Sequence, residues 1–553
     1  MKPWNTFGSN NPASQAGPNR RHFLKTGLLG AAATAALGST SLAQRRTVAD
    51  QPFEWQEATL AQLGAALRSG KTTSFQVTQA YLQRIDALDK HGPSVNSVIE
   101  LNPAASQIAA DRDRELQGKQ DRGPLHGIPI LIKDNIATAD NMSTTAGSLA
   151  LAGSIAKQDA FVVRKLREAG AVILGKTNLS EWANFRSAHS VSGWSGRGGL
   201  TRNPYALDRN PCGSSSGSGA AAAANFCAVA VGTETDGSVV CPASANGLVG
   251  IKPTLGLVSR SGVIPIAHSQ DTAGAMARTV TDAAVLLTVI QGFDSSDEAT
   301  LTVRDKAPLD YTKFLDLAGL RGARIGVVRK YAGFNDFVDR VLEEAIAAMK
   351  REGAAIVDPV EIPSIGKFDD SELEILLYEF KADLDKYLAA LGPAAPVHSL
   401  ADVIAFNQKN AAKEMPWFGQ DLFLQAQKKG PLISPEYLKA LEQNHKLTRA
   451  EGIDGAMEKN KLDALVAPTG GPAWLTDLAC GDHATGGSSS LPAVAGYPNI
   501  NVTAGWVFGL PVGISFFGRA FSEPALIKIA YAFEQATKQR KPPQFLPMVD
   551  LKA

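Results

Sequence analysis

Hydrophobic residues recur along this chain with helical spacing in some segments and in short apolar runs in others. Leu60, Leu63 and Leu67 fall on one helical face, and Ser74 is expected to be the N-cap of a second helix through Leu88. Further helices are predicted at residues 103–117, 161–169, 279–290, 336–352 and 525–535. Strands are predicted at residues 96–101, 126–134, 171–175, 323–328, 355–357, 462–466, 500–503 and 512–516. This alternation predicts an α/β fold with a largely parallel or mixed sheet.

The segment from about residue 366 to 460 departs from this alternation. Helical periodicity dominates residues 372–391, 400–410 and 435–459, with little strand signal. Because core strands precede and follow it, we expect a helix-rich insertion in one continuous domain, residues 44–553. Such an insertion is expected to form a lid or a substrate wall.

The N-terminal residues 1–43 do not look like part of the fold. Paired arginines in NRRHFLK (19–25) precede a weakly apolar run at 27–37, and small residues end at Ala43. This order resembles a signal peptide of the twin-arginine type, although a disordered basic tail is an alternative. The run is shorter and less apolar than a membrane span requires. We therefore predict export to the periplasm or the medium, with cleavage after Ala43.

Composition narrows the function classes. The chain has 553 residues, 44% hydrophobic and 20% charged, which is ordinary for a soluble globular enzyme. A net charge of +1 gives no electrostatic reason to expect nucleic acid or an anionic membrane as a partner. The four cysteines lack zinc-site spacing. Of these, Cys212 and Cys241 flank two serine clusters; a bridge between them is an alternative, but two small buried thiols are favoured.

Residues 212–253 contain two glycine–serine clusters around a mostly small, apolar run at 220–231. A flexible linker is the alternative interpretation of such clusters. A linker has no use for a run long enough to form a buried helix and strand, and core-like sequence follows at 247–251. Since glycine lets a substrate approach the main chain closely, we interpret the stretch as active-site backbone.

Residues 213–217 match G-x-S-x-G, which would make Ser215 an α/β-hydrolase nucleophile. That motif needs a strand immediately before it, whereas the composition of residues 201–211 is typical of a loop. The downstream histidines have no recognisable catalytic context; they are His268, His398, His445 and His483. A classical esterase triad is therefore disfavoured.

Lys133 ends an apolar strand, where a lysine is unexpected unless it reaches water or serves chemistry. At an unperturbed pKa, only about one lysine in two thousand is neutral at pH 7. Burial lowers a lysine pKa and would make the amine a usable general base. A salt bridge to Asp134 is the competing interpretation from the residues alone.

Separate motifs occur in a characteristic order at residues 127–135, 170–178, 213–219, 232–253, 462–469 and 497–518. Together they resemble the amidase signature family over roughly residues 57–540. The resemblance implies a single α/β domain whose twisted mixed sheet is covered by helices. It also implies amide hydrolysis by a Ser–cis-Ser–Lys triad, without a metal or cofactor.

By this resemblance, Lys133 takes the place of the family's base. Ser214 takes the place of the bridging serine, with a cis peptide bond from Gly213. Ser238 takes the place of the nucleophile. The resemblance further implies an oxyanion hole made of the backbone N–H groups of residues 235–238, which are Thr235, Asp236, Gly237 and Ser238.

The chain departs from the family pattern at several positions. Asp236 and Val240 replace a usual glycine and a frequent arginine, and Cys212 and Ser216 replace common glycines. Because the oxyanion hole uses main-chain donors, Asp236 need not damage it. Its carboxylate is expected to face the substrate or to position Ser215, a possible supporting residue together with Gly213.

The runs GTETDGS (232–238) and GLVSR (256–260) look most like those of the bacterial peptide amidases, which remove C-terminal amides and release ammonia. The resemblance therefore implies a peptide amide or other small amide as substrate. Hydrolysis of aryl or fatty amides is one enzymatic alternative, and a role like that of the amidase component of glutamyl-tRNA amidotransferase is another. A periplasmic peptide-binding protein is the non-enzymatic alternative.

Overall fold

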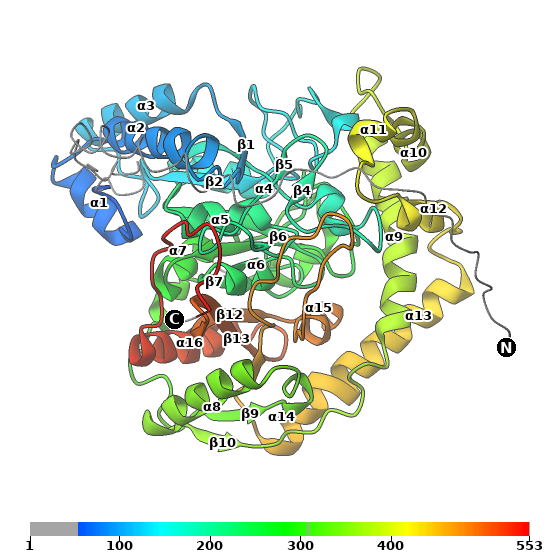
Figure 1. Ribbon diagram of the computed structural model, residues 1–553. Coiled ribbons are helices and arrows are strands. Elements are labelled where there is room, and N and C mark those ends of the chain that lie inside the picture. The colour runs from blue at the N-terminus through cyan, green and yellow to red at the C-terminus, as the bar shows by residue number, and fades with distance from the viewer. Residues whose placement is uncertain (1–52, 307–308, 552–553) are drawn as a thin grey trace, which may run out of the picture. The chain divides into compact units, whose positions relative to one another are not determined.

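A computed structural model describes residues 53–306 and 309–551, and a mixed β-sheet forms the centre of this region (Figure 1). The sheet has eleven strands in the order β1-β3-β2-β6-β8-β7-β12-β13-β11-β9-β10. The strands are β1 Val98–Leu101, β2 Pro129–Lys133, β3 Val172–Thr177, β6 Val229–Glu234, β7 Val249–Lys252, β8 Thr272–Ala277, β9 Arg324–Val327, β10 Ala355–Val357, β11 Ala464–Pro468, β12 Asn499–Val507 and β13 Leu510–Phe517. A separate pair joins β4 Trp194–Ser195 to β5 Gly199–Leu200.

Parallel pairing is concentrated in two parts of the sheet. Strand β2 runs parallel to both β3 and β6, and β9 runs parallel to both β10 and β11. The remaining neighbours in the large sheet are antiparallel. The predicted α/β fold with a mixed sheet is therefore confirmed.

Helices pack on the sheet and on one another. Helix α5 contacts α6, and both contact sheet strands, while α16 contacts α7 and α8. The helices are α1 Leu60–Arg68, α2 Ser74–Arg84, α3 Ala105–Gln117, α4 Phe161–Glu168, α5 Ser216–Ala223, α6 Val240–Ala245, α7 Val280–Ile290, α8 Asp336–Arg351, α9 Asp369–Ala390, α10 Leu400–Lys409, α11 Ala411–Glu414, α12 Asp421–Gln427, α13 Pro435–His445, α14 Asp454–Asn460, α15 Ser490–Ala495 and α16 Glu523–Thr537.

The start of α2 corrects one sequence prediction. Thr73 is the N-cap, because its side chain accepts from the N–H of Gln76 and the Gln76 side chain accepts from the N–H of Thr73. The hydroxyl of Ser74 instead donates to the carbonyl of Gly127 (2.7 Å) and ties α2 to the loop before β2.

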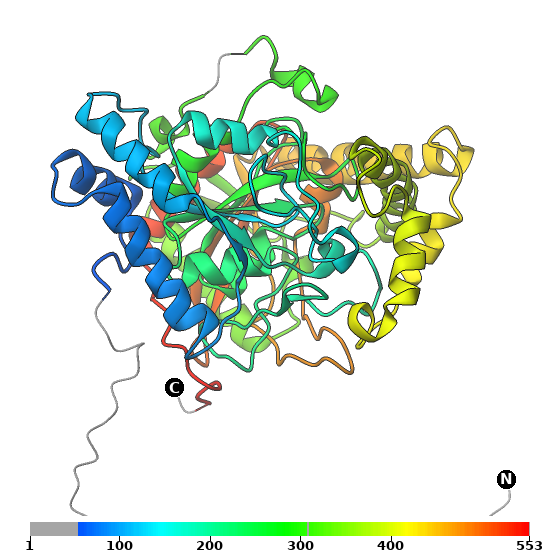
Figure 2. The ribbon, with the colours of Figure 1, turned by 90° about the horizontal axis from the view of Figure 1, so that it is seen from above.

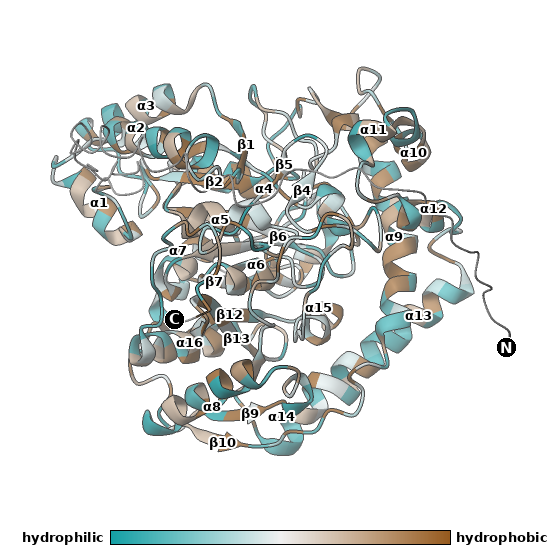
Figure 3. Ribbon diagram, viewed as in Figure 1, coloured by the Kyte–Doolittle hydropathy of each residue, from teal (hydrophilic) through white to brown (hydrophobic). Residues whose placement is uncertain are grey.

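The chain between β10 and β11 contains α9 to α14 and no β-strand, and α9 to α13 gather at one side of the sheet (Figures 1 and 2). Aromatic contacts join these helices to one another and to the core: Phe380 of α9 packs on Phe423 of α12 and on Phe185. Helix α13 is largely hydrophilic (Figure 3). In the described part of the chain, no helix combines the length and apolar character that a bilayer span requires. The predicted signal peptide, residues 1–43, lies outside the described residues.

Candidate active site

Three neighbouring elements bring the predicted site residues together. Strand β2 ends at Lys133 and runs beside β6, which leads into residues 235–238. Helix α5 begins directly after residues 213–215 and contacts both strands. The site therefore forms where two adjacent parallel strands end, a common position for ligand sites in α/β sheets.

Lys133 is fully buried, and its amine forms hydrogen bonds with two neighbouring residues. Its Nζ donates to the Oγ of Ser214 (2.7 Å), the Oγ1 of Thr233 (2.9 Å) and the carbonyl of Thr233 (3.2 Å). Burial lowers the pKa of Lys133 to about 7, although Asp271 and Glu234 oppose part of the shift. Near neutral pH a large share of these side chains is therefore neutral, as a general base must be.

The alternative salt bridge between Lys133 and Asp134 is absent among the described contacts. Asp134 instead pairs with Arg197, whose Nη1 lies 3.2 Å from its Oδ1. The same carboxylate accepts from the N–H of Gly147 (3.1 Å) and from the hydroxyl of Thr145. Asp134 thus stabilises the loop after β2. Lys133 does not pair with it and instead forms hydrogen bonds with Ser214 and Thr233.

The peptide bond between Gly213 and Ser214 is cis, as the family resemblance implies. A Cβ atom at Gly213 would overlap the Oγ of Ser180 and press on the Oγ of Ser192, so only glycine fits there. No hydrogen bond joins Ser215 to Asp236 among the described residues; the Oγ of Ser215 donates to the carbonyl of Thr233 and accepts from the N–H of the same residue. Ser215 therefore holds the first serine cluster against β6.

The second glycine–serine cluster, which contains Gly237 and Ser238, lies beside the first cluster, which contains Ser214 and Ser215. The N–H of Ser215 donates to the carbonyl of Ser238 (3.2 Å), and Gly237 has a φ of 74°, which favours glycine. Within the described chain, the N–H groups of residues 236–238 have no hydrogen-bond acceptor. These donors are therefore free to bind a ligand oxygen, and their role as an oxyanion hole stays a prediction.

Glu234 shapes this turn, a role that was not predicted from the sequence. Its Oε2 accepts from the N–H groups of Val239 (2.7 Å) and Val240 (3.0 Å), which begin α6. Thr233, which contacts both Lys133 and Ser215, was likewise missed. Both lie inside the GTETDGS run. Polar residues at the end of a buried strand were the sequence feature that could have identified them as site residues.

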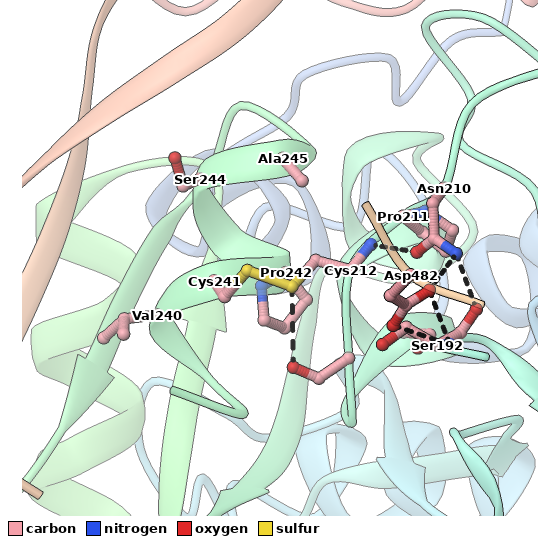
Figure 4. Close-up of a disulfide and its surroundings, with 12 residues drawn as sticks. Ser192, Asn210, Pro211, Cys212, Val240, Cys241, Pro242, Ser244, Ala245 and Asp482 are labelled. Carbon is pink, nitrogen blue, oxygen red and sulfur yellow. Dashed lines mark hydrogen bonds between the residues drawn. A yellow bond between two sulfur atoms is a disulfide. The ribbon is translucent and has the colours of Figure 1, made fainter. Parts of the chain in front are cut away.

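A disulfide joins Cys212 to Cys241, whose Cα atoms lie 6.0 Å apart (Figure 4). Cys212 precedes Gly213 and Cys241 lies shortly after Ser238, so the bond links the two serine clusters covalently. The preference for two free thiols is wrong. No local pattern reveals that cysteines 29 residues apart meet in the fold.

Removing this disulfide is expected to destabilise the protein. For a loop closed between cysteines 29 residues apart, the double variant Cys212→Ser/Cys241→Ser should lose about 3.6 kcal/mol of unfolding free energy. Urea unfolding followed by tryptophan fluorescence measures the loss, and Cys480→Ser, at an exposed free cysteine, is the control. An unchanged unfolding midpoint in the double variant would contradict the prediction.

Comparison with known proteins identifies the family of this chain. A family model named Amidase matches residues 76–527. A probable amidase of Arabidopsis thaliana is 46% identical, and the alignment covers 89% of this chain and 93% of that protein. The chain belongs to the amidase signature family. It is a hydrolase that acts on carbon–nitrogen amide bonds, so the peptide-binding-protein alternative is wrong.

Within the family, the chain is also similar to peptide amidases and to components of glutamyl-tRNA(Gln) amidotransferases. The native peptide amidase from Stenotrophomonas maltophilia is 53% identical, with a TM-score of 0.85, covering 89% of this chain and 100% of that one. A structure of a peptide amidase with the competitive inhibitor chymostatin gives the same values. One component of the glutamyl-tRNA(Gln) amidotransferase of Thermoanaerobacter pseudethanolicus is 33% identical, covering 89% of this chain and 99% of that protein.

Proposed function

We propose that this protein is a peptide amidase, which hydrolyses the C-terminal amide of peptides and releases ammonia. The observation that carries the proposal is the 53% identity to a peptide amidase over 89% of this chain. The buried contact between Lys133 and Ser214 supports the accompanying mechanism, because it joins a base of lowered pKa to a hydroxyl.

In this mechanism, neutral Lys133 accepts a proton from Ser214, and Ser214 accepts one from Ser238. The Oγ of Ser238 then attacks the amide carbonyl carbon. Backbone N–H groups of residues 235–238 stabilise the negative oxygen that forms. The carbon–nitrogen bond breaks as the proton returns through Ser214 to the nitrogen, and ammonia leaves. Water hydrolyses the acyl-enzyme, releases the acid and restores Ser238.

The test compares ammonia release by the purified mature protein from amidated dipeptides, aryl amides and fatty amides. We expect the highest kcat/KM for the dipeptide amides. A higher value for an aryl or fatty amide would reject the peptide specificity while leaving the amidase chemistry in place. Activity of the chain alone, without glutamine or tRNA, would separate it from a component of an amidotransferase.

We also propose that the protein is exported. The arginine pair at residues 20–21 and the apolar run after it support export, and the Cys212–Cys241 disulfide suits an oxidising compartment. N-terminal sequencing of the secreted protein should give Gln44 as the first residue. A secreted form that still begins at Met1 would reject the cleavage site.

A further inference from the structure

Asp236 lies two residues before Ser238 and has one carboxylate oxygen without a partner in the described chain. Its Oδ2 accepts from the hydroxyl of Ser490 (2.6 Å), whereas its Oδ1 is buried and has no hydrogen bond among the described residues. The residue as a whole is partly buried, but its Oδ1 is shielded from solvent. Burial raises the pKa of the Asp236 carboxyl, and the hydroxyls of Ser489 and Ser490 oppose that shift. A second carboxyl group shares this environment.

That second group is Glu372 on α9, which is 8% exposed. Its Oε1 accepts from the Nε2 of Gln270 (2.9 Å), and the same Nε2 lies 3.4 Å from the carbonyl of Thr235. Gln270 thus holds Glu372 against the loop that leads to Ser238. The Oε1 of Gln270, a residue only 1% exposed, has no partner within residues 53–306 and 309–551.

The negative charge of Glu372, when it is ionised, has more acidic than basic neighbours. Burial raises its pKa well above the usual value, and the negative charges of Asp236 and Asp369 raise it further. Lys252 is the cation that acts on Asp236, but it is buried and also faces Glu234. The raised pKa values mean that both carboxyls ionise less readily than usual when no cation is beside them, and a bound cation would favour their ionised form. The cluster also holds more hydrogen-bond acceptors than the described residues around it satisfy.

We propose that Asp236 and Glu372 form a subsite for a protonated amine or guanidinium carried by the acyl part of the substrate. Carboxylate oxygens and the Gln270 amide oxygen only accept hydrogen bonds, so a cation with several N–H donors matches them. Because the leaving group is ammonia, this cation must belong to the acyl part. The inference rests on the proposed function, since it concerns the substrate of the same site.

The test uses two pairs of dipeptide amides that differ in one positive charge. One pair ends in arginine amide or in its neutral near-isostere citrulline amide, and the other has a free or an acetylated N-terminus. Ammonia release should give a kcat/KM at least about tenfold higher for the charged member of one pair. Glu372→Gln and, separately, Asp236→Asn should bring that ratio close to one.

Asp370→Asn is the matched control, because it removes an exposed acid from the same helix and should leave the ratio unchanged. The subsite is rejected if neither pair shows a preference, or if Glu372→Gln and Asp236→Asn both keep it. If no peptide amide yields ammonia, the proposed function fails instead. Calorimetric titration of the Ser238→Ala protein with arginine amide and citrulline amide then decides the subsite: tighter binding of arginine amide supports it, and equal affinities reject it.

Discussion

Replacing Ser238 by alanine is expected to lower kcat on a peptide amide by at least about 10⁴-fold, because no other group replaces a lost nucleophile. The fold should be retained, since Ser238 contacts the first serine cluster through its backbone carbonyl, which alanine keeps. Ammonia release measures kcat, and circular dichroism shows whether the fold is retained.

Ser296→Ala, which removes an exposed hydroxyl, is the control for this substitution and should retain full activity. Activity within tenfold of the native protein in a correctly folded Ser238→Ala variant would show that another group attacks the amide. Ser215 would then be the next residue to replace, because it belongs to the neighbouring serine cluster.

The second large effect concerns Lys133 and pH. The base form is the neutral amine, and the pKa is lowered to about 7, so kcat/KM should fall as pH decreases through about 7 and level off above it. Lys133→Met keeps an unbranched apolar side chain but no base, and should lose about 10²–10⁴-fold in kcat.

Exposed Lys119 provides the matched control, since Lys119→Met should change neither the rate nor the pH profile. The profile is measured with a peptide amide whose own groups do not titrate between pH 5 and 9. A native profile without a limb near pH 7, or a Lys133→Met variant with the native rate, would remove Lys133 from the role of base.

Short apolar runs predicted most of the sheet, but they missed β8, Thr272–Ala277. The sequence of that strand is TAGAMA, and its alanine and glycine residues carry little β-propensity. It forms because it lies between β6 and β7, whose backbones supply hydrogen bonds on both sides. A strand that is stabilised mainly by its neighbours need not have a sequence pattern that predicts a strand.

In the site, too, some features could be predicted from the sequence and others could not. Lys133, Ser214 and Ser238 could be identified because each lies in a contiguous motif that resembles the family's. The pairing of Asp134 with Arg197 and the approach of Glu372 to the nucleophile loop depend on contacts between distant segments. The sequence around Glu372 shows only helical periodicity, so its place beside the site required the fold.

Mass spectrometry of the protein, quenched during turnover of a slowly hydrolysed amide, tests the serine nucleophile most directly. The mechanism predicts a mass increase equal to the acyl group, located on Ser238 and absent from the Ser238→Ala variant. Ammonia release with an adduct on another residue, or with none under conditions where deacylation limits the rate, would contradict it.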